Sequence, residues 1–319
     1  PKYKWVERLL EYQRKMKLLS TYVVGFEERM VYGVMNPSFL QTGTTSGRYS
    51  SRAPNWQNLP RDEKRIKACV ISRPGKVFVG ADFSQLEPRV FAYLSGDEAL
   101  KAAFNGTDDF YSVIGAAVYD KTDCVPRKDG SPDAFGIKYK KLRDLSKVIA
   151  LATVYGATSR QLASTTGKSP EETQQDMDNY LNRFPGVKKL MLESHTSAKK
   201  DGYVKSLFGR PRRIPQAKNI EADAKHGELP YEMRSLLNLS TNHRVQSTAA
   251  SIVNRAMINF HKMKEEIVPT ARLVTQVHDS LIIECDAEDA ETVSVLLQEA
   301  MENTTALPGV PLEAKPLIG

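Results

Sequence analysis

The feature that most constrains this chain is a pair of aspartates, far apart in the sequence, that each adjoin apolar runs. Asp82 directly follows the apolar residues 77–81, and Asp279 lies between apolar residues 273–274 and 281–283. Sheets present carboxylates to hard divalent cations in this way. Two such carboxylates that meet in space hold two metal ions about 3.5–4 Å apart, an arrangement that promotes in-line displacement at phosphorus. The sequence therefore predicts a sheet that brings the two aspartates together.

The residues around the aspartates have strand patterns, and those between them have mostly helical patterns. Residues 77–81 predict a buried strand. Residues 272–286 predict a β-hairpin with Asp279 at its tip. Residues 3–22 and 241–264 have apolar positions at helical spacing, and the former read as an amphipathic helix. We therefore expect an α+β fold in which a helical block is inserted into one sheet.

Composition is that of a globular protein whose charge favours a polyanionic partner. The chain has 319 residues, of which 41% are hydrophobic and 26% charged, and a formal net charge of +7 at pH 7. This length suffices for one large or two medium domains. Basic residues concentrate at 138–143 and 205–218, although a solvated charged face is an equal alternative for either cluster.

Cysteine usage and hydropathy exclude several other classes of protein. Cys69, Cys124 and Cys285 are isolated, with no spacing suited to zinc or to a disulfide framework. No apolar run approaches the ~18 residues that cross a bilayer, and the first residues lack signal-peptide character. We expect a cytosolic protein, in a bacterial cytosol or an infected host cell, that is neither secreted nor bound to a membrane.

Four short motifs occur in order along the chain. Residues 45–60 contain TSGRYSS followed by NWQNLP, and residues 82–89 read DFSQLEPR. Residues 143–156 have the spacing Arg-x3-Lys-x3-Leu-x3-Tyr-Gly, and residues 276–279 read QVHD. Together they resemble the template-primer loop, first palm motif, nucleotide-binding helix and last palm motif of the family A DNA polymerases, the group of bacterial DNA polymerase I and related phage enzymes. The resemblance covers nearly the whole chain.

The resemblance implies a right-hand polymerase architecture with an antiparallel palm sheet and a mostly helical fingers insertion, and with the thumb largely absent. We expect a helix at the thumb base in residues 1–25, the first part of the palm in 26–95, the fingers in 96–236 and the second part of the palm in 237–319. We also expect a thumb or exonuclease region as a partner, on the same or another polypeptide.

The resemblance further implies template-directed DNA synthesis, in which dNTPs are added to a primer 3′-hydroxyl with two Mg²⁺ ions, for which Mn²⁺ could substitute. The implied partners are primer-template DNA and dNTPs. The metal ligands implied are Asp82, the Phe83 carbonyl and Asp279, and the catalytic residues are Asp82, Asp279 and Lys147.

A ridge of residues on one predicted helix would bind the nucleotide. Positions 143, 147, 151 and 155 recur every four residues, so a helix places them in one row about 18 Å long, which matches the reach of a nucleoside triphosphate. By resemblance, Arg143 and Lys147 hold the phosphates, and Glu87 crowds the sugar 2′ position and rejects ribonucleotides. A first-turn glutamate favoured by the helix dipole is a compatible reading of Glu87. The predicted nucleotide-binding set is Arg143, Lys147, Leu151, Tyr155, Glu87, Gln85 and Tyr111.

The predicted DNA contacts follow from the same resemblance. Asn242 and Gln246 lie four apart on a predicted helix, and their amides suit the minor-groove acceptors that every correct base pair offers. His278 supports the primer terminus in this interpretation, with a turn role as the alternative. The full set of predicted DNA contacts is Arg48, Asn55, Gln57, Asn58, Asn242, Gln246, His278 and Arg89.

Several positions depart from the family pattern. Leu151 stands where the family usually has Phe or Tyr, and Ser280 where a glutamate is usual; Asn238 replaces a common arginine, and Tyr111 a histidine. None of these is a predicted metal ligand. Two alternative functions remain open here. They are a single-subunit RNA polymerase, which Glu87 disfavours, and a noncatalytic nucleic-acid-binding subunit, which retention of both aspartates disfavours.

Overall fold

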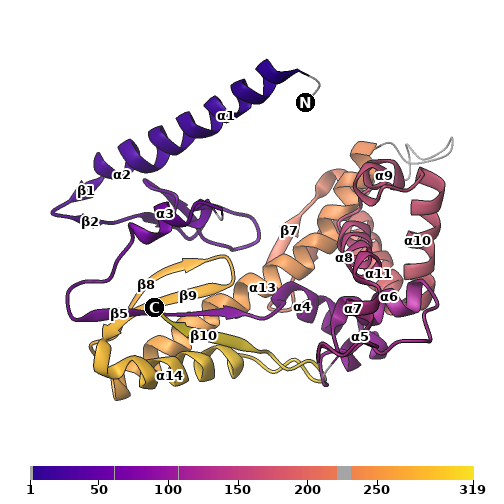
Figure 1. The fold of residues 1–319 in the computed structure, drawn as a ribbon. Coiled ribbons are helices and arrows are strands. Elements are labelled where there is room, and N and C mark those ends of the chain that lie inside the picture. Colours follow the sequence, from indigo (N-terminus) through magenta and orange to yellow (C-terminus); the bar gives the residue numbers. More distant parts are fainter. Residues whose placement is uncertain (1–2, 61, 107, 221–230) are drawn as a thin grey trace.

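The protein is seen in a computed structural model, which describes residues 3–60, 62–106, 108–220 and 231–319. One end of the molecule is built around a sheet and the other is helical, and a long helix joins the two (Figure 1). Residues 221–230, within the range predicted as fingers, lie outside the described residues. The boundaries predicted for the individual domains stay predictions.

A four-stranded antiparallel sheet forms the predicted palm. Its strand order is β10–β5–β9–β8, with β5 at Lys76–Phe83, β8 at Arg272–Val277, β9 at Ser280–Asp286 and β10 at Ala314–Ile318. Along β5 the side chains of Val79, Ala81 and Phe83 alternate toward the core, as expected for a strand with one buried face. Helix α14 (Ala290–Glu302) packs against β5 and β10. The predicted strand and hairpin are confirmed.

The segment between the two aspartates is mostly helical, as predicted. Its helices are α4 (Leu86–Ser95), α5 (Glu98–Ala102), α6 (Phe110–Val118), α7 (Phe135–Lys138), α8 (Lys140–Val154), α9 (Ser159–Thr166), α10 (Pro170–Arg183) and α11 (Pro185–Asp201). Capping boxes at Thr158 and Ser169 begin α9 and α10. A hairpin of β6 (Tyr203–Lys205) and β7 (Pro211–Arg213), which the helical pattern did not predict, follows, and then a 3-10 helix (Pro215–Asn219).

Helix α13 (Tyr231–Ile267) connects the two ends of the molecule (Figure 1). It contacts α4, α8 and α11 in the helical part and α14 beneath the sheet. Its buried side chains, among them Val245, Ile252 and Phe260, join those of the sheet and of the predicted fingers in one core. The predicted helix at residues 241–264 is therefore confirmed, and it extends further at both ends.

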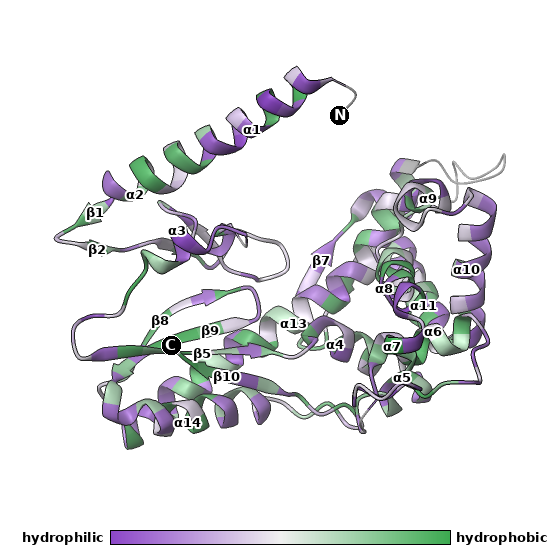
Figure 2. Ribbon diagram, in the orientation of Figure 1, coloured by the Kyte–Doolittle hydropathy of each residue, from purple (hydrophilic) through white to green (hydrophobic). Residues whose placement is uncertain are grey.

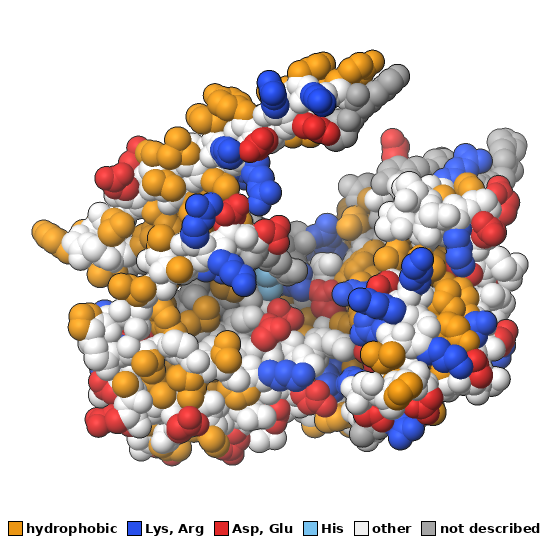
Figure 3. All heavy atoms as spheres, in the orientation of Figure 1, with side chains coloured by type: hydrophobic (Ala, Val, Ile, Leu, Met, Phe, Trp, Pro, Cys, Tyr) orange, Lys and Arg blue, Asp and Glu red, His pale blue; other side chains and the backbone are white. Residues whose placement is uncertain are grey.

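The N-terminal segment projects from the rest of the chain as an arm (Figure 1). It consists of α1 (Lys4–Leu18), a π-helical stretch (Leu19–Val24), α2 (Gly25–Glu27) and a hairpin of β1 (Met30–Val31) and β2 (Val34–Met35). The predicted helix is confirmed, but no residue of α1 is buried, and Trp5 is 64% exposed. Hydrophobic positions recur along the ribbon of the arm in Figure 2, and Figure 3 shows hydrophobic side chains on its surface. In the described residues, no helix has the length and hydropathy to span a bilayer.

The base of the arm is tied to the segment that precedes the sheet. That segment contains β3 (Ser38–Leu40), β4 (Ser50–Arg52), a 3-10 helix (Trp56–Asn58) and α3 (Lys64–Ala68). Tyr22, Phe26 and Trp56 form a small separate core, with the Phe26 and Trp56 rings 5.6 Å apart. The Tyr22 hydroxyl also donates to the Asn58 carbonyl over 2.7 Å. These contacts hold the base of the arm against the predicted template-primer loop.

Candidate active site

The two aspartates converge at one end of the sheet, as the sequence predicts. Asp82 lies near the end of β5 and pairs in register with Ser280, the first residue of β9, and Asp279 is in the turn just before it. The Phe83 amide donates to the Asp279 carbonyl over 3.2 Å. The Ser280 hydroxyl donates to Asp82 Oδ1 over 2.6 Å. The antiparallel register thus places both carboxylates side by side.

Burial and the neighbouring carboxylate perturb Asp279. Burial, followed by the negative charge of Asp82, raises the pKa of Asp279 to about 6, although Arg48 acts in the opposite direction. The two carboxylates are hard oxygen donors, and the cations of the protein do not fully balance their charge. The pair could therefore hold a divalent cation. The described residues contain no group of three or more His, Cys, Asp or Glu side chains that could hold a metal.

The raised pKa predicts a pH-dependent cost to stability in the metal-free protein. Because the folded protein keeps the Asp279 proton up to higher pH than the unfolded chain, its stability falls as the pH rises from about 4 to about 6. We expect Asp279→Asn to remove this loss and to unfold with a free energy about 1–2 kcal/mol higher than wild type at pH 8, allowing for screening of a partly exposed group. Urea unfolding in EDTA at pH 4 and pH 8 measures it. Equal stability of both proteins at both pH values would contradict the raised pKa of Asp279.

Glu87, in the first turn of α4, joins the sheet side of the site to the helical side. One carboxylate oxygen accepts a hydrogen bond from Arg48, and the other accepts one from the Tyr155 hydroxyl. Burial and the charge of Glu87 raise the pKa of Tyr155. Gln246 of α13 lies close enough to the Tyr155 side chain to oppose part of this rise in pKa. The structure thus brings four predicted site residues from four segments into one cluster.

The predicted nucleotide-binding ridge lies on α8, with Tyr155 directly after its last residue. The Lys147 ammonium is exposed and has no carboxylate partner among the described residues; it lies 5.7 Å from the centre of the Tyr111 ring. The Arg143 guanidinium instead makes two hydrogen bonds to Asp109, of 2.7 and 2.8 Å. The buried Tyr111 therefore lies under both cations, and burial raises its pKa to about 12. Of the two cations, Lys147 is the one free to meet an anionic ligand.

The predicted template-primer loop packs on the hairpin that carries Asp279. Asn55 caps the 3-10 helix by accepting from the Gln57 amide, so its side chain has a structural role here. Gln57 Nε2 donates to Gln276 Oε1 over 3.1 Å, and Gln276 in turn donates to the His278 carbonyl. His278 is exposed at the hairpin tip with φ +58°. Its backbone therefore makes the turn, while its side chain remains available.

Comparisons with known proteins decide the family of the chain. The sequence model of DNA polymerase family A matches residues 1–319. The chain belongs to this family. It is 33% identical to the thermostable DNA polymerase I of Thermus aquaticus over 98% of this chain, and 33% identical to DNA polymerase I of Bacillus subtilis over 97% of it. The match covers 36% and 33% of those two proteins, so the chain spans about a third of their length.

A solved structure confirms the fold of this family A chain. The POL domain of Pol1 from M. smegmatis, in complex with DNA primer-template and dNTP, matches it with a TM-score of 0.83 and 30% identity, over 98% of this chain and 52% of that one. The predicted right-hand α+β architecture is thereby confirmed. The single-subunit RNA polymerase and the noncatalytic subunit, the two alternatives, gain no support from these matches.

The prediction that Arg89 contacts DNA is wrong. Its side chain is 1% exposed, because this face of α4 turns toward the core. The guanidinium donates to the carbonyls of Ser84 and Pro311, forms a 2.6 Å ion pair with Glu313 and lies 4.7 Å from the centre of the Phe104 ring. Arg89 thus fastens the segment before β10 to the segment between β5 and α4.

Arg89→Met is expected to destabilise the fold without acting on DNA directly. It leaves two carbonyls and a carboxylate without their donor, which costs about 2–4 kcal/mol of unfolding free energy. Urea unfolding measures this loss, and fluorescence anisotropy measures DNA affinity well below the unfolding midpoint. A variant of wild-type stability with strongly weakened DNA binding would restore the original prediction.

Other predicted residues have polar atoms without protein partners. Asn242 Oδ1 and Gln85 Oε1 are buried and have no hydrogen-bond partner among the described residues. Gln85 has φ +55° immediately before α4. Leu151 and Tyr155 line a small cavity of about 20 Å³ between α4 and α8, next to Glu87. A side chain larger than Leu151 would have this space to fill.

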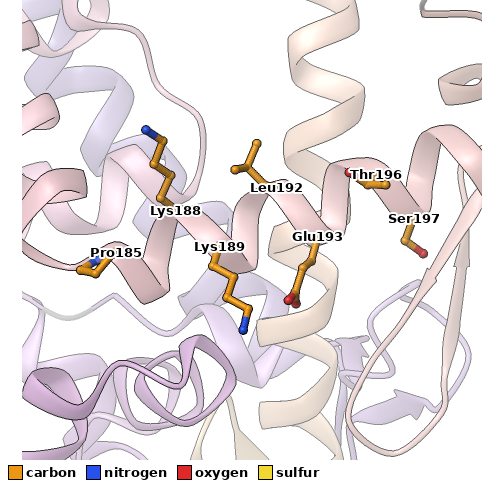
Figure 4. Close-up of a pocket in the computed structure, with 7 residues that line it drawn as sticks. All are labelled: Pro185, Lys188, Lys189, Leu192, Glu193, Thr196 and Ser197. Atoms are coloured by element: carbon orange, nitrogen blue, oxygen red, sulfur yellow. The ribbon is translucent and has the colours of Figure 1, made fainter.

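A larger hollow, of about 580 Å³, lies on the surface of α11, far along the chain from the carboxylates. It is lined by Pro185, Lys188, Lys189, Leu192, Glu193, Thr196 and Ser197 (Figure 4). All seven residues belong to one helix, and none is a predicted site residue. We do not assign it to the site.

Sequence reasoning missed Asp109, which positions Arg143. Asp109 caps α6, where its carboxylate accepts from both the amide and the hydroxyl of Ser112. Burial alone would raise its pKa, but the bonds from Arg143 and Ser112 hold it below its usual value. An aspartate directly before an apolar helical run is an N-cap signal that could have identified its first role. Nothing local in the sequence indicates its pairing with Arg143.

Proposed function

We propose that this chain carries out template-directed DNA synthesis, in which a primer 3′-hydroxyl displaces pyrophosphate from a dNTP. The observation that supports this most directly is the convergence of Asp82 and Asp279 at the end of the sheet. A second support is the Glu87 cluster, which links the sheet to α8. The activity, the substrates and the partners are proposals, because the chain spans only about a third of the relatives' length.

The carboxylates of Asp82 and Asp279, with the Phe83 carbonyl, would hold two Mg²⁺ ions. When bound, these ions would favour loss of the primer hydroxyl proton and neutralise charge on the leaving group. Mn²⁺, which also accepts carboxylate and carbonyl ligands, would substitute. Ser280 orients Asp82 through its hydrogen bond, in the place where the family usually has another carboxylate.

The side chains of α8 would bind the triphosphate. Lys147 presents an exposed ammonium that would neutralise charge on the phosphates as they separate. Arg143 would join it by exchanging its bonds to Asp109 for bonds to phosphate, since a guanidinium binds both groups in the same bidentate geometry. Tyr111 supports the two cations from beneath.

The Glu87 cluster would read the sugar of the incoming nucleotide. Its carboxylate is held on both sides, by Arg48 and by Tyr155, so it cannot swing away without losing charged hydrogen bonds. A fixed carboxylate at this place would leave no room for a 2′-hydroxyl. Leu151 lines the same region but offers no aromatic face for the sugar.

Primer-template DNA would lie along the loop and α13. Arg48, Gln57, Asn58, Asn242, Gln246 and His278 are the proposed contacts. The basic residues Lys205, Arg210 and Arg213 of the β6–β7 hairpin are exposed and have no ion pair among the described residues. Arg210 packs over Gly47 of the template-primer loop, so these cations would extend the DNA surface. A thumb or exonuclease region and a cytosolic setting remain part of the proposal.

A primer-extension assay with Mg²⁺ and a defined template tests this function. We expect extension with the four dNTPs that follows the template sequence, much slower extension with rNTPs, and none in EDTA. Extension that ignores the template would contradict the proposed function, and equal use of rNTPs would contradict the role of Glu87. If the folded chain remained inactive even when upstream polymerase sequence was added, the proposed function would be overturned.

A further inference from the structure

The polar face of α13 meets the backbone at the C-terminal end of α8. Asn238 Nδ2 donates a hydrogen bond of 3.2 Å to the carbonyl of Gly156, the residue directly after Tyr155. Gly156 has φ +75°, and the amides of Gly156 and Ala157 bond back to Thr153 and Ala152. A glycine in this conformation is the usual end of a helix. Asn238 therefore contacts the turn that ends the nucleotide-binding helix.

The contact is close as well as polar. A Cβ atom placed on Gly156 would lie 1.6 Å from Asn238 Nδ2, so the amide occupies the space directly over the glycine. The position is also half-buried, where an unpaired carbonyl would be costly. The turn thus has little freedom to shift while Asn238 remains in place.

The same face of α13 also reaches the side chain of Tyr155. Positions 238, 242 and 246 are spaced by four, so they lie in one row on the helix. Gln246 lies close enough to the Tyr155 side chain to influence its pKa, and Asn238 holds the backbone immediately after that residue. Helix α13 therefore faces Tyr155 and is bonded to the residue that follows it.

Tyr155 in turn donates to Glu87, which is the proposed gate against ribonucleotides. Asn238 is thus linked to Glu87 by its hydrogen bond to Gly156, by the peptide bond between Gly156 and Tyr155, and by the hydrogen bond from Tyr155 to Glu87. Asn238 itself is not part of the proposed metal site, phosphate contacts or sugar gate. Its place in the family pattern is commonly an arginine.

We propose that Asn238 is a positioning residue for nucleotide selection, which fixes Tyr155 through the Gly156 carbonyl. This inference rests on the proposed function, because it concerns how that site binds the dNTP. Loss of the bond would let the end of α8 move away from the nucleotide. The dNTP would then bind more weakly, and the gate at Glu87 would be less well held.

Two substitutions separate this role from simple packing. Asn238→Asp keeps the size of the side chain but replaces the donor with an acceptor, and Asn238→Ala removes both. We expect each to raise the KM for dNTP by about tenfold while kcat changes by less than about threefold, since binding geometry rather than chemistry is altered. The preference for dNTP over rNTP should also fall. The matched control is Asn259→Ala, which removes a similar amide bond, to Thr304, elsewhere on α13.

A double-mutant cycle with Tyr155→Phe tests whether the effect passes through Tyr155. If it does, Asn238→Ala changes KM much less in the Tyr155→Phe background than in wild type. Independent effects, or a wild-type KM and rNTP discrimination in both Asn238 variants, would overturn the inference. A loss of thermal stability equal to that of Asn259→Ala, with kcat and KM changed in proportion, would also reduce Asn238 to a structural role.

Failure of the inference about Asn238 can be distinguished from failure of the proposed function. All these measurements compare variants with a wild-type chain that extends a primer. If wild type does not extend, the proposed function fails first. If wild type extends and the Asn238 variants match it, only the inference fails.

Discussion

Replacing Asp82 or Asp279 with alanine is expected to abolish primer extension while leaving primer-template affinity within about threefold of wild type. Each substitution removes one of the two carboxylates that converge at the sheet end. Metal-assisted stabilisation of phosphoryl transfer is worth several kcal/mol, so the rate should fall by about 10³-fold or more. DNA affinity should persist, because it comes mainly from phosphate contacts elsewhere. Single-turnover extension and fluorescence anisotropy measure the two quantities.

Asp286→Ala is the matched control for this experiment. Asp286 is the last residue of β9, at the far end of the sheet from the pair, and it forms a partly buried ion pair with Lys76. We expect its extension rate to stay near wild type. Normal extension by either Asp82→Ala or Asp279→Ala would refute the assignment of the metal ligands. Circular dichroism shows whether an inactive variant is still folded.

Lys147→Ala is expected to lower kcat/KM for dNTP by about 10²–10³-fold, the usual loss when one preorganised charge is removed from a developing anion. Lys147 has the effect because its ammonium is exposed on α8 and no described carboxylate competes for it. Arg143→Ala should lower kcat/KM less, because Arg143 is bonded to Asp109 and must leave it before it can bind a phosphate. Pre-steady-state extension over a range of dNTP concentrations measures the loss.

The control for Lys147 is Lys141→Ala, on the same helix. Lys141 is also exposed, but six residues separate it from Lys147, which turns it to a different side of α8. We expect it to retain nearly full kcat/KM. Equal losses in the two variants would mean that general positive charge, rather than the position of Lys147, is what the nucleotide requires.

The parts of the site that the sequence predicted are those fixed by local pattern and chain order. The strand around Asp82 and the hairpin around Asp279 have apolar runs that are typical of strands with a buried face, and they pair in one sheet. The four-residue spacing on α8 likewise survives folding, since a helix preserves it. These features depend on residues close in sequence, and the resemblance then set their order.

The parts that could not be predicted depend on contacts between distant residues. Arg48 and Arg89 both belong to the short motifs, yet one faces Glu87 and the other is buried against Pro311. No local pattern distinguishes an arginine that turns outward from one that turns inward. The bond from Asn238 to Gly156 was hidden for the same reason, as it spans two helices. Only the packing of α4, α8 and α13 decides these directions.

The most direct test of the central claim is to count Mn²⁺ ions by electron paramagnetic resonance. The sample contains the chain, a dideoxy-terminated primer-template and the matching dNTP. We predict two bound ions for wild type, and the loss of at least one in both Asp82→Asn and Asp279→Asn, with two retained in Asp286→Asn. An unchanged count in the Asp82 and Asp279 variants would contradict a metal site formed by these two carboxylates.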